Sequence, residues 1–578
     1  MNQGDKMDLE ERLSYVHSDT KQGQDGEYTE AKTPGELEDG ALVEGGALPI
    51  WSREAFGLYS QYFTIGVIYG MIPALNYPIF NFYLQMEGYQ TASYSVLVNL
   101  GWSYKVLFGM FSDCFPIFGY RRKSWMVIGW TVAMICLAVM FFSSLGDPYC
   151  NWMTEYKDYC KLTLSKVPKE IQEKNYDFEA PDRGAKFIIL SMLVSFGYVT
   201  AACASDAMVV EYAQREPIAI RGRVQTAIYV WRYIGSIIAV AVPAFGLNGA
   251  NYNGSFSFSM APNVPYGICL IPCVMVVLTT IFVVVEKKSP GIPLKTWVSQ
   301  FWGLLQQRAM WQICAFRFIN NVFYGISTTA GSPIESWWAK VEPLNTSLAN
   351  MLGKAIFAVA LSVVGKYGLH WNWRWIIAIG SLGTIFIDAI MAFFTIADVV
   401  RNQWFWTGTG LTENVPSGLR FIVGTYCAVE IADPGVEGAT YGLITTMNNV
   451  AAPVASVIYK YIDSYFKVSQ NDIKSDTHEV RWDAAYTYII MYSCMIFSLV
   501  FLVMLPPQKK ELQELKKKGG QSKLAGFILV FLFVGVLTFS MISSIMSIYP
   551  STKCYRIAGG NGKLDHATGK CPIAAPKK

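Results

Sequence analysis

Charged residues are scarce in this chain. Only 16% of its 578 residues are Asp, Glu, Lys or Arg, and 52% are hydrophobic, whereas about 25% charged residues are usual in soluble domains. So little polar surface cannot solvate a large globule, which excludes an ordinary soluble protein of this size. The apolar residues fall instead into blocks of about 20, the length that a helix needs to cross a hydrocarbon core about 30 Å thick.

Histidine is also rare. The four histidines lie outside the apolar blocks or at their ends, which leaves no metal or haem cluster inside a membrane: His17, His370, His478 and His566. No paired nucleophile and base stands out, so we expect no enzyme, no metal and no cofactor. The net charge of +4 is small and follows from loop residues that obey membrane topology, so nucleic-acid binding has no support.

Thirteen apolar blocks predict thirteen membrane helices in contact with the lipid bilayer. They cover residues 57–79, 92–111, 124–144, 187–210, 224–245, 265–285, 309–329, 347–368, 373–397, 418–434, 439–459, 484–505 and 524–548. Residues 1–55 are rich in Asp, Glu and Gly and contain no apolar run, so neither a secretory signal nor a packed domain is expected there. We interpret this segment as a disordered, acidic, cytosolic tail.

Basic residues sort between alternate loops. Arg121 and Arg122 follow the second block, and further basic residues follow blocks four, six and twelve. The positive-inside rule therefore places the even-numbered loops and the N-terminus in the cytosol and the C-terminus outside, with the plasma membrane as the favoured location. The short loop 433–437 is acidic and carries no orientation signal.

Features of exported loops agree with this orientation. Two sequons, at Asn253 and Asn345, fall in loops predicted to lie outside, where they indicate a glycoprotein. Two cysteine pairs fall outside as well, and an oxidising compartment would join them as disulfides: Cys150 with Cys160, and Cys554 with Cys571.

A charged, proline-containing segment divides the blocks into two sets. We expect six-helix bundles at 56–285 and 309–505, joined by a cytosolic connector at 286–308. A basic cytosolic linker at 506–523 then leads to an additional membrane helix at 524–548 and a non-cytosolic tail at 549–578. Duplicated bundles commonly hold a binding site between the halves and open it alternately to each side.

Four short segments resemble a known family. Residues 109–123 read GMFSDCFPIFGYRRK, which resembles the loop signature of the major facilitator superfamily, and 365–374 is a degenerate copy without the acid. With the preceding GWSYK at 101–105, the stretch looks like the fingerprint of the folate-biopterin transporter family. Further resemblance lies in SDAMVVE at 205–211, in EGAT at 437–440 and in TTMNN at 445–449.

The resemblance implies an all-α membrane protein of major facilitator type, a folate or pterin cargo and proton symport. It covers roughly residues 57–505, so the thirteenth helix and its tail extend past the usual twelve. An Asp and a basic cluster form the hinge of that superfamily, which implies a gating role for Asp113, Arg121 and Arg122, with Glu211 as their partner.

Three basic residues lie deep in predicted spans: Lys105, Arg232 and Arg317. A charge at mid-helix costs about 2.5 to 3.5 kcal/mol on insertion scales, so each is expected to face a partner or a water-filled cavity. On span seven, the spacing places a polar stripe along one helical face, which we expect to line a cavity, comprising Arg317, Asn320, Asn321 and Tyr324. The alternative role for such a stripe is hydrogen bonding between helices.

A folate-like cargo has carboxylates that Arg binds through two parallel hydrogen bonds, and a flat ring that stacks on aromatic side chains. Arg232 and Arg317 suit the first task. Lys105 either shares it or neutralises Asp206 as an internal ion pair. Tyr69 and Tyr77 are the kind of single aromatic residues that more often pack or anchor a helix than stack on a ligand.

Proton coupling requires a carboxyl group that loads and releases a proton near neutral pH. The candidates inside predicted spans are Asp206, Asp388 and Glu430, and the first lies in a segment that carries the family resemblance. The favoured function is therefore secondary active transport of folate or a related pteridine by alternating access. The alternatives are another small organic anion or nucleoside-like solute on the same scaffold, or a receptor or channel.

Overall fold

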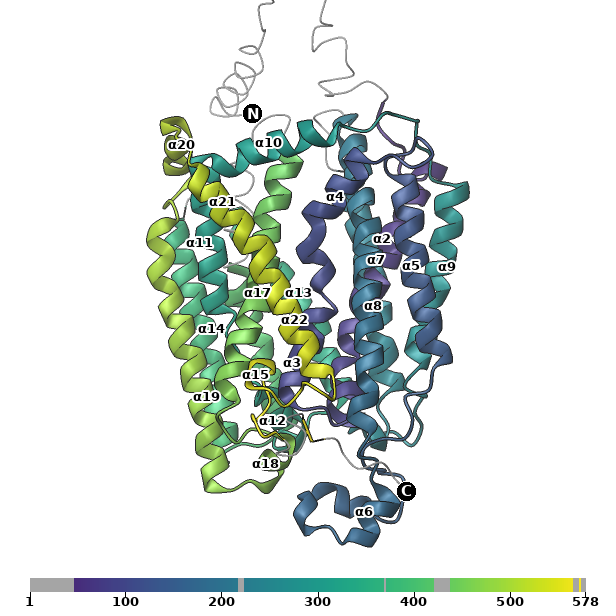
Figure 1. The fold of residues 1–578 in the computed structure, drawn as a ribbon, viewed down its shortest axis with the longest axis vertical. Helices are drawn as coiled ribbons and strands as arrows, with labels where there is room; N and C mark the ends of the chain where they lie inside the picture. Colours follow the sequence, from purple (N-terminus) through teal and green to yellow (C-terminus); the bar gives the residue numbers. More distant parts are fainter. Residues whose placement is uncertain (1–45, 217–222, 368–370, 420–436, 565–570, 573–578) are drawn as a thin grey trace, which may run out of the picture.

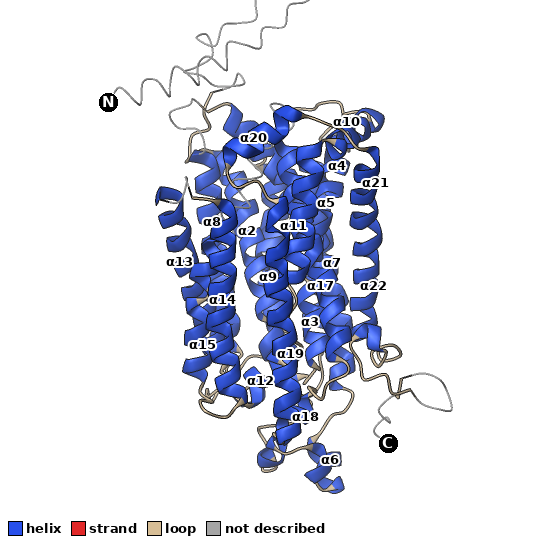
Figure 2. Cartoon of the chain, turned by 90° about the vertical axis from the view of Figure 1, so that its left-hand side faces the viewer, coloured by secondary structure: helices blue, strands red, loops and turns tan. Residues whose placement is uncertain are grey.

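The computed structural model describes residues 46–216, 223–367, 371–419, 437–564 and 571–572. This part of the chain consists of helices and loops (Figure 2), and eight of its helical segments are long and apolar enough to cross a membrane. The all-α membrane fold predicted from composition is confirmed. Twelve of the thirteen predicted spans coincide with described helices, several of which are shorter or interrupted.

Five long helices form most of the N-terminal half. They are α2 (Arg53–Ala74), α5 (Lys123–Phe142), α7 (Ala180–Gln214), α8 (Arg223–Gly246) and α9 (Val264–Phe282). The first continues as the π-helix η2 (Asn76–Tyr83). The second predicted span is not one helix: it is divided into α3 (Gly88–Leu97), the 3-10 turn η3 (Leu100–Tyr104) and α4 (Lys105–Cys114).

The C-terminal half contains a second set of helices. They are α11 (Arg308–Tyr324), α13 (Pro343–Tyr367), α14 (Trp373–Ile396), α17 (Glu437–Asp463) and α19 (His478–Phe497), which continues as η8 (Ser498–Met504). Span seven is interrupted after Tyr324 and followed by α12 (Gly331–Trp337). Span ten begins earlier than predicted, with α15 (Gln403–Thr412), and most of the range 418–434 lies outside the described residues.

Shorter helices lie at the two ends of the bundle. At the end that carries Arg121 and Arg122, here called the basic end, α10 (Leu294–Gln306) crosses the predicted connector and α20 (Lys509–Lys518) forms the basic linker (Figure 1). The opposite end is called the disulfide end. Its short elements are η4 (Lys157–Lys161), η5 (Leu164–Lys166), α6 (Lys169–Asn175), η7 (Ala250–Tyr252), α18 (Gln470–Ser475) and η10 (Arg556–Ala558).

The thirteenth span lies across the boundary between the halves. It consists of α21 (Lys523–Phe531), the π-turn η9 (Leu532–Val536) and α22 (Leu537–Ile548), and it runs diagonally across the front of Figure 1. Helix α22 packs against α3 of the N-terminal half and α17 of the C-terminal half. The additional helix therefore packs against both halves and links them.

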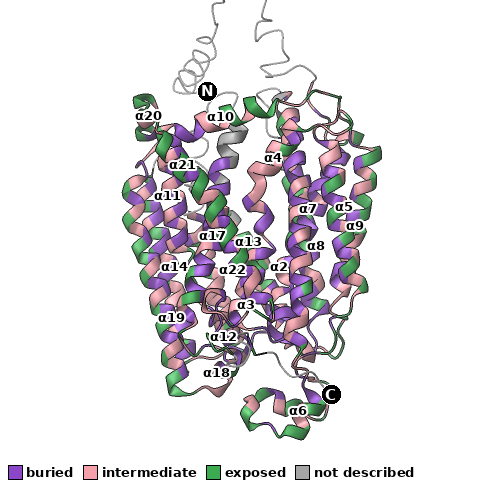
Figure 3. Ribbon diagram, viewed as in Figure 1, coloured by how far each residue is buried: buried purple, intermediate pink, exposed green. Residues whose placement is uncertain are grey.

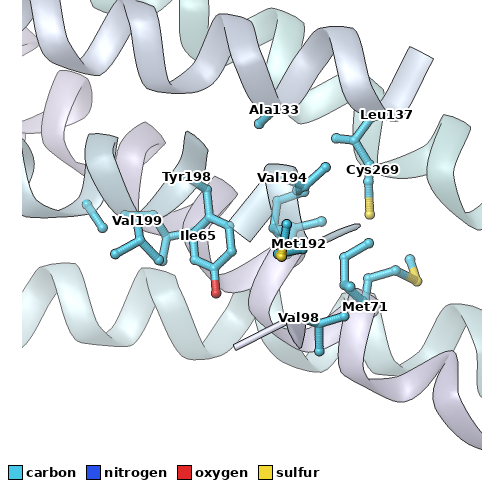
Figure 4. Packing of buried hydrophobic residues seen from close by; sticks show 14 of the residues in the cluster. Ile65, Met71, Val98, Ala133, Leu137, Met192, Val194, Tyr198, Val199 and Cys269 are labelled. Atoms are coloured by element: carbon cyan, nitrogen blue, oxygen red, sulfur yellow. The ribbon is translucent and has the colours of Figure 1, made fainter. Parts of the chain in front are cut away.

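The largest core cluster joins the N-terminal helices through aliphatic, methionine and aromatic side chains, some of which Figure 4 shows: Ile65, Met71, Val98, Leu137, Met192 and Tyr198. Large apolar side chains remain exposed along the outer faces of helices such as α5 and α9 (Figure 3), for example Ile135 and Ile271. These faces are suited to lipid, because lipid chains can cover the apolar surface that water would not.

Glycine sets the separation of α2 and α8. A methyl group on Gly66 would lie 2.0 Å from the backbone oxygen of Arg232, and one on Gly235 would lie 2.3 Å from that of Phe63. Only the absence of a side chain allows this approach, which is the small-residue packing common between membrane helices. The contact fixes the position of Arg232 relative to α2.

Candidate functional site

An ion pair lies in the middle of the N-terminal half. The Lys105 ammonium group at the start of α4 lies 2.7 Å from Asp206 Oδ2 on α7, and the Tyr62 hydroxyl on α2 donates to Asp206 Oδ1 at 2.5 Å. The side chains of Lys105 and Asp206 are 26% and 35% exposed, so the pair is partly accessible. The pairing of these two residues was one of the two roles predicted for Lys105.

Arg232 lies beside this pair on two aromatic rings. Its guanidinium carbon is 5.2 Å from the ring centre of Tyr69 and 5.3 Å from that of Trp102, distances at which a cation is attracted to the ring face. The Trp102 indole donates a 2.9 Å hydrogen bond to the Tyr198 hydroxyl, which holds the ring in place. We call these seven residues the cationic-aromatic cluster: Tyr62, Tyr69, Trp102, Lys105, Tyr198, Asp206 and Arg232.

The cluster adjoins the C-terminal half. The Asn449 side chain on α17 donates to the Trp102 carbonyl at 3.2 Å, and the Ser103 hydroxyl donates to the Asn449 carbonyl at 3.0 Å. Three segments that carry the family resemblance, 101–105, 205–211 and 445–449, therefore meet at one place. A movement of one half against the other must change these contacts.

The aromatic part of the cluster was missed in the sequence. Packing or anchoring was the favoured role for Tyr69, and Trp102 was not singled out, because a single ring in an apolar helix gives no signal of what will lie on its face. The available signal was the GWSYK segment, in which Trp102 lies three residues before Lys105.

The polar stripe on α11 is only partly what the spacing predicts. Asn320 is 3% exposed, and its amide donates a 2.7 Å hydrogen bond to the Ser498 carbonyl of span twelve. Its role is thus the alternative one, hydrogen bonding between helices, because an amide buried in a bilayer requires a partner. Arg317, Asn321 and Tyr324 lie on the same helix and are half-buried.

A second group of carboxyls lies within the C-terminal half. The Tyr492 hydroxyl on α19 donates to Asp388 Oδ2 on α14 at 2.8 Å, and the carboxyl groups of Asp388 and Glu413 are near enough to interact electrostatically. Glu413 was missed because the predicted span ten began at residue 418, which left it in a loop. Glu430, the third predicted proton carrier, lies outside the described residues.

The four predicted gating residues come together at the basic end. Arg122 pairs with Asp113 at 2.7 Å, and both Arg122 and Arg121 lie near Glu211, at 3.7 and 3.8 Å. All four belong to the N-terminal half, so these ion pairs brace α4, α5 and α7 within one half. A further carboxylate, Glu286, accepts hydrogen bonds from the backbone N–H groups at the start of α5 and stabilises that helix end.

Many hydrogen bonds join the halves at the disulfide end. The Asn81 amide donates to Ser336 Oγ at 2.7 Å, and Ser255 Oγ donates to Glu342 at 2.8 Å. The Gln470 backbone N–H donates to the Glu87 carboxylate at 2.8 Å. These contacts close the disulfide end in this conformation.

Two titratable groups of this closed end lie outside the spans, Glu87 just before α3 and Lys474 on α18. Burial raises the pKa of Glu87 to about 7, although the Gln470 N–H group opposes the shift. Burial also lowers the pKa of Lys474 to about 7, against the attraction of Glu87. Lys474 donates to Gln85 Oε1 at 3.0 Å and lies 3.9 Å from the ring centre of Trp337.

The predicted disulfides and sequons also lie at this end. Cys150–Cys160 and Cys554–Cys571 are both joined as disulfides, with Cα atoms 5.8 and 5.5 Å apart. Asn345 is 7% exposed, so a glycan there would require this segment to rearrange. The Asn253 amide donates to the Val341 carbonyl at 3.0 Å.

Comparison with known proteins supports the sequence resemblance. A model of the BT1 family matches residues 66–146, which include α3, η3 and α4. Over 484 residues the chain is 22% identical to a folate-biopterin transporter from Synechocystis sp., covering 81% of this chain and 85% of that protein. The family resemblance predicted from the motifs is confirmed.

Solved structures share the fold. A peptide transporter in complex with sulfate aligns with a TM-score of 0.53 and 10% identity, over 81% of this chain and 97% of its own. The E. coli xylose transporter XylE, in a partially occluded inward-open conformation, aligns with a TM-score of 0.51 and 13% identity, over 79% of this chain and 100% of its own. The chain therefore has the major facilitator fold, and with the family resemblance it is a membrane transporter and not an enzyme.

Proposed function

We propose that this transporter, which resembles the folate-biopterin family, carries folate or a related pteridine across the membrane by alternating access. The observation that carries the proposal is the cationic-aromatic cluster. It combines two cations, a carboxylate and flat rings next to the boundary between the halves.

The cluster suits an anionic cargo with a conjugated ring. Arg232 offers a planar guanidinium that can bind a carboxylate through two hydrogen bonds, and this group lies against the rings of Tyr69 and Trp102. Trp102 and Tyr69 also provide aromatic faces for contact with the cargo. Arg317 on α11 stays the proposed partner from the C-terminal half.

Lys105 gives the cargo a way to act on Asp206. In this structure the two side chains neutralise each other at 2.7 Å. A cargo carboxylate that takes Lys105 leaves Asp206 without its cation in a site of low polarity, where a carboxylate is unfavourable. Asp206 then gains a proton, so that cargo and proton move together. This exchange is the proposed basis of proton symport.

Alternating access would use the contacts between the halves. The hydrogen bonds at the disulfide end must break for that end to open. The hydrogen bond from Asn449 to the Trp102 carbonyl, which joins the opposite half to the cluster, must change as the halves move. We propose that the basic end faces the cytosol of a cell whose plasma membrane holds the protein, as the distribution of basic loops predicts.

Uptake of labelled folate by cells that express the chain tests the proposal. We expect Arg232→Ala to lower uptake at least tenfold with unchanged abundance at the membrane, and Arg232→Lys to retain part of it, because lysine keeps the charge but not the planar fork. Arg215→Ala is the matched control, since Arg215 also lies on a tyrosine ring, 4.9 Å from the centre of Tyr212, but at the basic end.

Competition identifies the cargo class. Unlabelled pterins should reduce folate uptake, whereas nucleosides and amino acids should not. Competition by nucleosides alone would favour the alternative cargo on the same scaffold. Uptake that neither saturates nor follows a proton gradient would favour a channel and contradict the proposal.

A further inference from the structure

A cavity of about 170 Å³ lies between the halves, toward the disulfide end from the cationic-aromatic cluster. The N-terminal half contributes Asn76 and Asn81 from η2, and the C-terminal half contributes Glu335 from α12 together with residues of α13. The cavity exists only while the halves are closed at this end. Opening of the disulfide end would separate its two walls.

The lining contains one carboxyl group. Glu335 is the single acidic residue among the lining residues, all of which are described, and these include no Lys, Arg or His. Its carboxylate accepts a 3.1 Å hydrogen bond from the Thr346 hydroxyl. A carboxylate has about four acceptor positions, so most of its capacity remains for a ligand.

An amide oxygen in the same lining has no partner. Asn76 Oδ1 is buried and has no hydrogen-bond donor, whereas its amide nitrogen already donates to Ser95 Oγ at 2.9 Å and to the Thr91 carbonyl at 3.3 Å. These bonds fix the orientation of the amide and leave its oxygen as an acceptor only. A buried acceptor without a donor costs free energy, which a ligand rich in N–H groups would recover.

We infer that this cavity receives the aminopyrimidinone edge of a pteridine ring, with the Glu335 carboxyl group as its main partner. This inference rests on the proposed function and adds a second cargo subsite to it. The edge presents an amino group beside a ring N–H, two parallel donors that match the two oxygens of a carboxylate. The amino group has a second hydrogen, which suits the Asn76 oxygen.

The position of the cavity agrees with the shape of folate. Tyr69, in the cationic-aromatic cluster, and Asn76, in the cavity, are seven residues apart on the same span, or about 10 Å along the helix axis. Folate is elongated, with its carboxylates at one end and its pteridine ring at the other. The cluster therefore takes the acidic end and the cavity takes the ring.

Competition by the two ends of folate tests this division. The probes are pterin, which has only the ring, and p-aminobenzoylglutamate, which has only the acidic end. We expect Glu335→Gln to weaken inhibition by pterin about ten- to a hundredfold and to leave inhibition by p-aminobenzoylglutamate unchanged, because one charge-assisted pair is lost. Arg232→Ala should give the opposite pattern.

Controls separate recognition from folding. Glu335→Gln keeps the shape of the side chain. Glu479→Gln removes an exposed carboxylate at the same end that pairs with Lys467 and does not line the cavity, so it should change neither inhibition constant. Asn76→Leu should weaken pterin alone, more mildly than Glu335→Gln, because it removes one uncharged acceptor.

The outcomes are distinguishable. Equal weakening of both probes by Glu335→Gln, or none, overturns the pteridine subsite while leaving folate transport intact. If uptake requires Na⁺ and Glu335→Gln removes that requirement while both probes still inhibit, the cavity binds an ion. That result also overturns the pteridine subsite. If expressing cells take up no folate, direct binding of pterin to the purified protein, measured by pterin fluorescence, still tests the subsite. Binding that Glu335→Gln abolishes supports the subsite even where folate uptake is absent.

Discussion

Lys460 on α17 donates a 2.9 Å hydrogen bond to the hydroxyl of Ser93 on α3, and so connects the two halves through a fully buried ammonium group. It also donates to Ser547 on α22 at 3.0 Å, and Ser547 in turn donates to the Ala558 carbonyl at 2.6 Å. The additional helix and the tail after it are thus joined to both halves by one buried cation.

Substitution of Lys460 tests how α22 is held. We expect Lys460→Ala to lower the stability of the purified protein by about 2 to 4 kcal/mol, because it leaves a cavity and two hydroxyls without their donor. Lys460→Met fills the same space without the cost of burying a charge, and should be close to neutral. Thermal unfolding of both variants in one detergent measures the difference. A greater loss in Lys460→Met than in Lys460→Ala would contradict this account.

The Lys105–Asp206 pair predicts a dependence between two substitutions. Lys105→Met alone leaves an uncompensated carboxylate in the membrane and should cost on the order of 3 kcal/mol or lower the abundance of the protein. Lys105→Met combined with Asp206→Asn removes both charges and should restore abundance but not proton-driven uptake. Membrane abundance and folate accumulation, measured on the single and double variants, give the coupling. Additive losses of abundance would show that the two residues do not act as a pair.

The Asp388–Glu413 pair predicts a second place where protons act. Two neighbouring carboxyl groups repel each other when both are ionised, which favours a state in which the pair holds one proton. If this proton is carried through the transport cycle, Glu413→Gln should abolish accumulation against a gradient and leave exchange of labelled for unlabelled cargo intact. Asp206→Asn, at the other proposed proton site, is measured for accumulation and exchange in the same way as a comparison. Normal accumulation in Glu413→Gln would make the pair a structural contact of α14, α15 and α19.

Glu87 and Lys474 predict how stability depends on pH. Glu87 has a pKa of about 7 in the folded protein, above the value near 4.5 expected when unfolded. Between these values the folded state binds more protons than the unfolded state, so the free energy of unfolding falls as pH rises, by on the order of 3 kcal/mol. Glu87→Gln should flatten this decline when melting temperature is measured between pH 5 and pH 7.

Lys474 should reverse the trend at higher pH. Its pKa is about 7 in the folded protein, below the value near 10.5 expected when unfolded. Above pH 7 the unfolded state binds more protons, so stability rises with pH through this region. Lys474→Met should remove the rise, whereas Glu479→Gln, which changes an exposed carboxylate at the same end, should alter neither arm. A curve without a minimum near pH 7 would contradict both assignments.

Sequence patterns predicted the lipid-crossing segments well where a span is one regular helix, as in α5 and α14, because hydrophobic length is a local property. They were less accurate where a span is interrupted. The break after Tyr324 and the turn at residues 100–104 lie within polar or mixed segments whose backbone is stabilised by neighbouring helices. The early start of α15 escaped detection because the helix follows an Asn cap and contains Gln, Thr and Gly.

The sequence by itself determined that the chain is a helical membrane protein, which residues are deep cations, and which segments resemble a transporter family. Hydropathy and motif identity are written along the chain and require no partner. Only the tertiary structure decided that Lys105 meets Asp206, that Arg232 lies on Tyr69 and Trp102, and that Glu335 and Asn76 line one cavity. These relationships depend on how helices distant in sequence pack together, with Gly66 and Gly235 allowing the closest approach, and a one-dimensional pattern does not contain that packing.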